Sequence, residues 1–263
     1  MTSTNCLNCK NELTGNFCSN CGQKADTHRI TLKNFIFHDV LHGTFHIDKG
    51  ILFTAKQALI RPGKAALDYI SGKRKPYYNV FYLILITFGL IVFFIHFYDV
   101  LSGEVTPEKK YINDASRKMD EIFSQKSKII IFLFVPFAAL NSFMLFKRKK
   151  LNLAEHAIIA GMILLGMLLY SLFGNLFFYL EILTPFNKTF SFLMSWLFTL
   201  LIIFQIGFGY YNAFRADYSK LGIAYRVVLF YGLLFLEILI LLFIAIGYVT
   251  HWKYGEISLT PFG

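Results

Sequence analysis

Five long apolar stretches fill most of the chain after residue 79, and they restrict it to a membrane-spanning fold. A helix that rises about 1.5 Å per residue needs about 20 mostly apolar residues to cross the hydrocarbon of a bilayer. The stretches that reach or approach this length are 79–98, 129–146, 157–180, 191–214 and 227–250. Because hydrocarbon offers no partners for backbone N–H and C=O groups, each stretch is predicted to be a helix. The second is the shortest, and Pro136 is expected to kink it.

The composition agrees with an integral membrane protein. Hydrophobic residues make up 56% of the 263 residues, aromatic residues make up 18%, and the mean hydropathy is +0.51, which is too apolar for an ordinary soluble domain. The first part of the chain, 1–34, is polar and has no basic segment leading into a short apolar one, so no cleavable signal peptide is expected. Insertion is therefore predicted to use the internal segments.

All four cysteines lie near the start of the chain as two CxxC pairs, Cys6 with Cys9 and Cys18 with Cys21. Each CxxC turn supplies two thiolates, so the two turns together predict a tetrahedral site for one structural zinc ion. A module this small has no hydrophobic core, and metal binding would supply its folding energy. A mononuclear iron site and a pair of disulfides are the alternatives. Four protein ligands leave no open coordination position, so the metal is not expected to be catalytic.

Short amphipathic segments separate this zinc ribbon from the first span. Apolar residues recur at helical spacing in 30–41, 51–59 and 66–70, with Arg61-Pro62-Gly63 between the last two. Such helices lie in a membrane interface, so we expect a cytoplasmic collar. The predicted fold is an all-α integral membrane bundle of about five transmembrane helices with a small N-terminal zinc ribbon and this amphipathic-helix collar. Its domains are the ribbon at 1–27, interfacial helices at 28–78, and the membrane region at 79–263 with an outer amphipathic loop near 104–128.

Basic residues beside the spans predict the orientation, because they concentrate on the cytoplasmic side. Three clusters fall on one side of the predicted membrane: Lys73-Arg74-Lys75, Lys147-Arg148-Lys149-Lys150, and the set Arg215, Lys220 and Arg226. The outer loop near 104–128 carries six basic residues diluted by five acidic ones. The amino terminus is therefore predicted to be cytoplasmic and the carboxyl terminus periplasmic. The reducing cytosol also suits four thiolates on zinc.

Positive charge also indicates the partners of the chain. The formal net charge is +10, and most of the excess lies beside the spans, where it is expected to contact anionic lipid headgroups. Nucleic acid is therefore not the expected partner, although the ribbon leaves that alternative open. A candidate surface for a protein partner or lipid headgroups is formed by Arg61, Lys64, Lys73, Arg74 and Lys75.

The interval before the first span resembles a known family. The residues that carry the resemblance are Asp48-Lys49-Gly50, Arg61-Pro62-Gly63-Lys64, the run Tyr69-Ile70-Ser71-Gly72-Lys73-Arg74-Lys75, and Leu153-Ala154-Glu155-His156. Together with the CxxC ribbon they make the chain similar, over nearly its whole length, to a bacterial family known only as a domain of unknown function. The resemblance implies a multi-pass architecture in the bacterial inner membrane. It implies no catalytic residues.

Three groups of polar residues are candidates for function. Glu155 and His156 lie at the start of the third span, where an acidic residue stabilises the positive end of a helix dipole; alternatively they form a ligand or partner site with the basic collar. Glu237 lies near the middle of the fifth span, where a carboxylate must be protonated or paired. It is either a hydrogen-bonding link to Asn141, Asn175 or Gln205, or a transport site. The spacing of His38, His42 and His46 allows a second metal site, but Gly43 interrupts the helix.

No phosphate-binding glycine loop, nucleophile elbow or HExxH motif is present in the sequence. The leading hypothesis is an inner-membrane scaffold or regulator that presents the ribbon as a cytoplasmic docking surface for a protein. One alternative is a small transporter or channel that uses Glu237. Another is a membrane enzyme that acts on a lipid-linked substrate through residues such as Glu155 and His156. Homo-oligomerisation is left open, and no catalytic residue is assigned.

Overall fold

The structure is a computed structural model, and it describes residues 5–25, 27, 30–31, 50–102, 111, 113–123, 130–184 and 186–252. Several predicted features lie outside these residues. They are the first predicted collar helix from residue 32 onward, the three histidines His38, His42 and His46, the beginning of the outer loop, and the carboxyl-terminal end.

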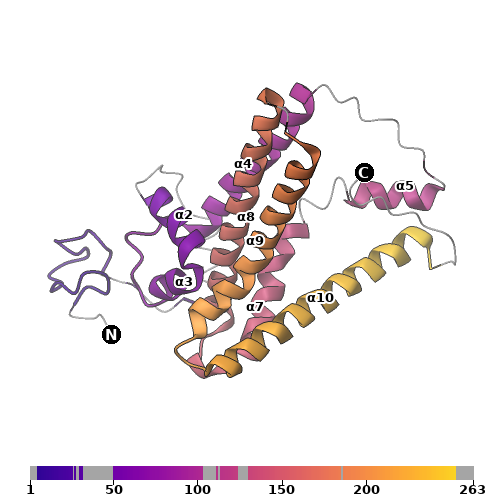
Figure 1. Ribbon diagram of the computed structural model, residues 1–263. Helices are drawn as coiled ribbons and strands as arrows, with labels where there is room; N and C mark the ends of the chain where they lie inside the picture. Colours follow the sequence, from indigo (N-terminus) through magenta and orange to yellow (C-terminus); the bar gives the residue numbers. More distant parts are fainter. Residues whose placement is uncertain are drawn as a thin grey trace.

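Helices make up nearly all of the described chain beyond the N-terminal module (Figure 1). Their order is α2 (Gly50–Ile60), α3 (Pro62–Ile70), α4 (Val80–Ser102), α5 (Asp114–Glu121), the 3₁₀ turn η3 (Ile131–Leu133), α7 (Phe134–Leu145), the 3₁₀ turn η4 (Lys147–Lys149), α8 (Leu153–Leu183), α9 (Lys188–Phe214) and α10 (Lys220–Thr250). The described chain is thus all-helical, as expected, with a cysteine cluster at its N-terminal end.

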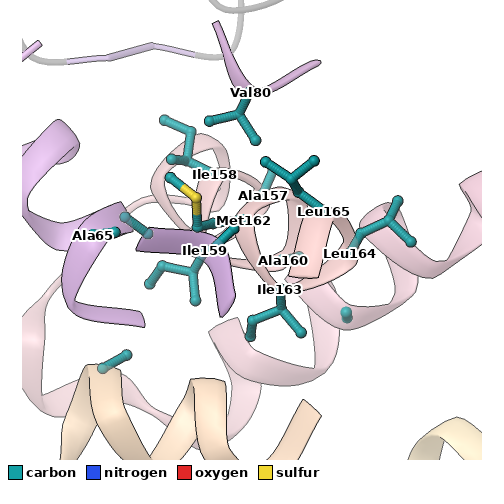
Figure 2. Close-up of a cluster of buried hydrophobic side chains, with 14 of the residues drawn as sticks. Ala65, Val80, Ala157, Ile158, Ile159, Ala160, Met162, Ile163, Leu164 and Leu165 are labelled. Atoms are coloured by element: carbon teal, nitrogen blue, oxygen red, sulfur yellow. The ribbon is translucent and has the colours of Figure 1, made fainter. Parts of the chain in front are cut away.

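Helix α8 is the centre of the bundle. Every residue from Ala157 to Leu165 is buried, so this helix is apolar all round and is covered on every side. Figure 2 shows its side chains from Ala157 to Leu165 meeting Ala65 of α3 and Val80 of α4. The burial explains why this stretch carries no polar stripe. A helix with no solvent-facing side needs none.

Helices α4 and α8 run parallel, and their contacts show how they are aligned. Phe81 packs on Gly161, and the Tyr179 hydroxyl donates to the carbonyl oxygen of Phe94. Gly161 lies eight residues after Leu153, so α8 extends about 12 Å beyond the start of α4. The first two turns of α8 therefore extend past the start of α4, on the side of the bundle where α4 begins. Because α4 and α8 point the same way, the chain between them must return to the starting side.

Four helices in the described residues, α4, α8, α9 and α10, are long and apolar enough to cross a membrane. The predicted second span, 129–146, is shorter in the structure. Its described residues form Ile131–Leu145, about 22 Å of helix against the about 30 Å of a hydrocarbon core. Phe132 contacts Phe88 near the middle of α4, at 5.0 Å between ring centroids.

Pro136 lies beside a change of helix type. It lies in the first turn of α7, directly after the 3₁₀ turn η3, and the helical residue Ile130 precedes that turn. The first turn of a helix has backbone N–H groups without intrahelical partners, so a proline there sacrifices no hydrogen bond.

Helix α10 diverges from the other long helices (Figure 1). Only 6% of its most apolar window is buried, compared with 72% for α8. Near its beginning it is tied to α9 by the Tyr231 hydroxyl, which accepts from the Gly207 N–H at 2.8 Å and donates to the Ile203 carbonyl oxygen at 2.6 Å. An apolar helix with this much exposed surface needs lipid around it.

Candidate metal centre

The N-terminal module consists of two nearly identical turns that repeat every twelve residues. In the first, the Cys6 N–H donates to the Asn11 carbonyl oxygen at 2.8 Å, and in the second the Cys18 N–H donates to the Gln23 carbonyl oxygen at the same distance. The position after each second cysteine has a positive φ, 66° at Lys10 and 70° at Gly22. Each CxxC pair thus folds into the tight knuckle that presents two sulfurs to one point.

The four sulfurs converge as a tetrahedral metal requires. All four Sγ atoms lie within 4.8 Å of one another, with Cys6 and Cys21 at 3.6 Å and Cys9 and Cys18 at 3.5 Å. Zinc–sulfur bonds of about 2.3 Å would place the sulfurs about 3.8 Å apart. The four thiols are free, which does not fit the alternative of two disulfides. The cluster can therefore hold one metal ion.

The thiols of this cluster do not ionise equally. Burial raises the pKa of Cys21, but hydrogen bonds from the Asn8 side chain and the Gln23 backbone outweigh burial and lower it to about 6. For Cys9 a hydrogen bond from the Asn11 backbone lowers the pKa, while burial and the neighbouring sulfurs raise it to about 11. Thiolates this close repel one another, so a bound cation is needed before all four can be ionised together.

The module is attached to the loop between α3 and α4 by the side chain of Gln23. This residue is only 6% exposed, and its Nε2 donates to the Gly72 carbonyl oxygen at 2.8 Å. Its Oε1 accepts from the backbone N–H groups of Arg74 and Lys75, both at 3.2 Å. One carboxamide thus satisfies three backbone groups of the loop. Gln23 follows the second cysteine knuckle directly, so the knuckle positions it.

The first knuckle makes a second contact with the same loop. Leu7 packs on Gly72, whose φ is +98°, and a Cβ at Gly72 would lie 2.5 Å from Leu7 Cδ1. Glycine is needed here both for the backbone conformation and for space. Leu7 and Gln23 were not recognised as functional residues in the sequence, because neither has a chemistry that distinguishes it from an ordinary surface residue.

The five basic residues of the predicted partner surface divide between the two ends of α3. Lys73 pairs with Asp68 at 3.0 Å, and Lys73, Arg74 and Lys75 all belong to the loop that the module holds. Arg61 and Lys64 lie at the opposite end of α3. There Arg61 donates to Gln57, and the Lys64 backbone N–H donates to Asn212 of α9 at 2.8 Å.

Two of the predicted collar helices, α2 and α3, pack directly on the bundle. Gly63 allows α3 to touch the backbone of α9 at Gly209, and the Gln205 side chain of α9 donates to the Ala58 carbonyl oxygen of α2 at 2.6 Å. Ala58, Ala65 and Ala66 are fully buried. The small side chains of α2 and α3 therefore cover α8 and α9.

Glu155 and His156 have separate partners. Glu155 forms a capping box with Asn152, accepting from its backbone N–H at 2.8 Å, while Asn152 Oδ1 accepts from the Glu155 N–H at 2.9 Å. His156 Nδ1 lies 2.8 Å from Ser142 Oγ, and its ring packs between Phe143 and Phe214. His156 is 1% exposed and Ser142 is fully buried. Ser142 was not singled out in the sequence, because a lone serine in an apolar helix carries no signal.

Glu237 has one of its three expected partners. Its Oε2 accepts from Asn141 Nδ2 at 3.0 Å. Gln205 donates to α2 instead, and Asn175 donates to the Ser171 carbonyl oxygen of its own helix at 2.8 Å. Among the three expected partners, the structure therefore pairs Glu237 with Asn141 alone, which links α7 to α10.

The comparisons with known proteins concern the segment that the module holds. No curated protein and no solved structure matches the chain. One interval, 48–93, matches a family, and it includes the Arg61-Pro62-Gly63 turn and the loop that Gln23 binds. The segment Leu153-Ala154-Glu155-His156 lies outside it. The likeness is therefore shown for a shorter part of the chain than the resemblance implied. Residues 48–93 match the family described as "Protein of unknown function (DUF3667)".

Proposed function

We propose that the chain is a scaffold or regulator of the bacterial inner membrane, in which an N-terminal zinc ribbon presents a docking surface to a protein in the cytoplasm. The observation that carries this proposal is the attachment of Gln23 to the loop before α4. A partner that binds the ribbon would also act on the first span, because the three hydrogen bonds of Gln23 join the ribbon to the loop that leads into this span. A freely tethered module could not transmit such an effect.

Zinc is the proposed occupant of the cysteine cluster. Four thiolates at tetrahedral spacing suit zinc, and the two knuckles leave no position for substrate, so the role of the metal is structural. Once bound, the metal would hold Leu7 and Gln23 at their places on the loop.

The free side of the ribbon offers a surface for docking. Phe17 is 63% exposed and forms an antiparallel bridge with Lys24. Exposed aromatic side chains contribute strongly to protein interfaces. We propose Phe17 as the anchor for the partner.

The proposed orientation places the ribbon in the cytoplasm and the carboxyl terminus in the periplasm. It is supported by the basic loops at 147–150 and 215–226, which lie at the same end of the bundle. The parallel course of α4 and α8 adds to this support, since the chain must cross back between them.

A second candidate function is transport through Glu237. It is supported by the pairing of this carboxylate with Asn141 between two apolar helices. Catalysis at His156 has weaker support, because the described residues bury both His156 and Ser142 and a substrate would have no access to them.

The test compares proteins that co-purify with the full chain in mild detergent. Phe17→Ser keeps the metal but removes the proposed anchor, and Cys18→Ser removes the metal. Both variants are expected to lose the same partner protein, while Lys56→Gln, a change at an exposed residue of α2, keeps it. If the same proteins co-purify with all four forms of the chain, the docking function is wrong.

A further inference from the structure

Two loops at one end of the bundle, together with the first turns of α10, bring seven basic residues together. They connect α7 to α8 and α9 to α10, and they lie side by side because Phe146 stacks on Phe214 at 4.4 Å and the Arg148 backbone N–H donates to the Tyr218 hydroxyl at 3.1 Å. The basic residues are Lys147, Arg148, Lys149, Lys150, Arg215, Lys220 and Arg226. Asp217 is the one acidic residue of the two segments 146–152 and 215–226.

Two of these basic residues converge on one aromatic ring, and we call Arg148, Tyr218 and Arg226 the arginine clamp. The guanidinium carbons of Arg148 and Arg226 lie 4.7 and 4.2 Å from the centroid of the Tyr218 ring, so they are at most about 9 Å apart. Tyr218 is 8% exposed, and Phe146 packs edge-on against it at 5.9 Å. The ring is therefore a fixed platform that holds two positive charges close together.

The hydrogen bonds of the clamp leave its charges without a carboxylate. Arg148 donates to the backbone oxygen of Asp217 at 2.7 Å, and Arg226 donates to the Leu145 carbonyl oxygen at 3.0 Å. The Asp217 carboxylate pairs with Lys149 at 2.7 Å. Within the described ranges both guanidiniums thus meet only neutral oxygens. Carbonyl oxygens orient an arginine but do not neutralise it, and two arginines so oriented favour an anion.

Apolar side chains beside the clamp indicate the kind of anion. Leu221, Tyr225 and Val228 are 84%, 50% and 69% exposed on the first turns of α10, next to Arg226. Free phosphate would gain nothing from this surface, whereas the acyl chains of a lipid would cover it. Arginine and tyrosine beside exposed aliphatic side chains are typical of the membrane interface.

The clamp also lies at the depth of lipid headgroups. Leu145, which Arg226 contacts, is about one turn beyond Ser142, and Ser142 is level with His156 in the first turn of α8. That turn lies outside the start of the first apolar span α4. Headgroup phosphates occupy this zone next to the hydrocarbon.

We propose that the arginine clamp binds the phosphate of an anionic phospholipid, whose acyl chains lie on the exposed first turns of α10. Arg148 of η4 and Arg226 of α10 bind the phosphate together, and the lipid would thereby fix the angle at which α10 leaves the bundle. This site is separate from the metal centre, and its failure would leave the function proposed for the ribbon untouched.

Native mass spectrometry of the full chain in non-ionic detergent tests the proposal. Phosphatidylglycerol is compared with phosphatidylcholine of the same acyl chains, and inorganic phosphate is added at millimolar concentration as a competitor. We expect phosphatidylglycerol to bind at least about tenfold more tightly than phosphatidylcholine and to resist phosphate. The pair Arg148→Gln and Arg226→Gln should remove this preference. The control pair Lys56→Gln and Lys188→Gln, at exposed residues of α2 and α9, makes the same change in charge and should keep it.

Three results would overturn the proposal. The first is equal binding of the two lipids, and the second is that the variant with Arg148→Gln and Arg226→Gln binds phosphatidylglycerol as the unmodified chain does. The third is displacement of the lipid by inorganic phosphate, which would show a site for free anions. If the glutamine pair elutes as aggregate in size exclusion, the pair Arg148→Lys and Arg226→Lys replaces it. This pair keeps both charges but loses the forked geometry, and it should weaken phosphatidylglycerol binding severalfold. Binding equal to that of the unmodified chain would contradict recognition by the clamp.

Discussion

Gln23 donates to the Gly72 carbonyl oxygen across 49 residues of chain, at 2.8 Å and out of contact with solvent. The same side chain accepts from two further backbone N–H groups, so it completes the hydrogen bonding of a loop that belongs to no regular element. The cysteine knuckle places Gln23 and the loop leads into α4. The state of the metal centre is therefore linked to the start of the first span.

Replacing Cys18 with serine is expected to release the metal and to free the loop at 72–75. A knuckle with one thiolate missing cannot complete the tetrahedral site, and the module has no core to replace the lost energy. Metal analysis of the purified variant should find less than one ion per chain, and trypsin should cut after Lys73 or Arg74 faster than in the unmodified protein. Insertion of the spans should be unchanged, because their stability comes from apolar helices. Stoichiometric metal in the variant would contradict the four-cysteine site.

Replacing Gln23 with leucine tests the attachment without removing a metal ligand. Leucine fills similar space but removes all three hydrogen bonds of the attachment, and the Arg74 N–H keeps only its bond to the Gly72 carbonyl oxygen at 3.0 Å, so the change should cost about 1–3 kcal/mol. The variant should keep its metal and yet show the fast trypsin cleavage of the loop. Asn16→Leu, at an exposed position of the same module, is the control and should leave cleavage unchanged. Slow cleavage in the Gln23 variant would mean that the attachment contributes little.

Gly72→Ala is expected to destabilise the loop by about 1–3 kcal/mol, because alanine resists a φ of +98° and its Cβ would meet Leu7. The two causes can be separated by combining Gly72→Ala with Leu7→Ala. The double variant removes the steric conflict but keeps the backbone strain, so part of the loss should be recovered. Thermal unfolding in detergent measures the stability of the single and double variants. Additive effects of the two substitutions would show that Leu7 and Gly72 do not interact.

The sequence predicted the large features of the fold because apolar length and cysteine spacing are local signals. Four of the five predicted spans are long apolar helices, and the cysteine cluster forms as expected. The second predicted span is shorter in its described residues. The sequence could not show this, since hydropathy records how apolar a segment is but not the depth at which it packs. The attachment by Gln23 and the clamp on Tyr218 could not be predicted. Both depend on contacts between distant segments, and a glutamine or tyrosine has the same local pattern whether or not it makes such contacts.

The orientation of the chain predicts the activity of fused reporters. A reporter that works only in the periplasm should be active after Gly263 and silent after Lys150. The basic residues at 147–150 predict that Lys150 is on the cytoplasmic side, and the parallel course of α4 and α8 puts it on the side where α4 begins. A cytoplasmic reporter at the same two positions serves as the control and should give the opposite result. Activity of the periplasmic reporter after Lys150 would show that the short helix α7 does not bring the chain back.

Glu237→Gln separates the scaffold from the transporter. Glutamine keeps an oxygen that can accept from Asn141 Nδ2, so a residue that only links α7 to α10 should tolerate the change, with a loss of stability below about 1 kcal/mol. Leucine at the same position loses the acceptor and should cost more, which provides the control for the hydrogen bond. A transport site would respond differently, because its carboxylate must change its ionisation and glutamine cannot. We therefore expect Glu237→Gln to keep the thermal stability of the chain and its ribbon-dependent partner, whereas the pair Arg61→Ala and Arg74→Ala at the two ends of α3 should lose the partner without unfolding the bundle. If instead the cellular phenotype is lost with Glu237→Gln and unaffected by the arginine pair, the carboxylate performs the function and the scaffold proposal is wrong.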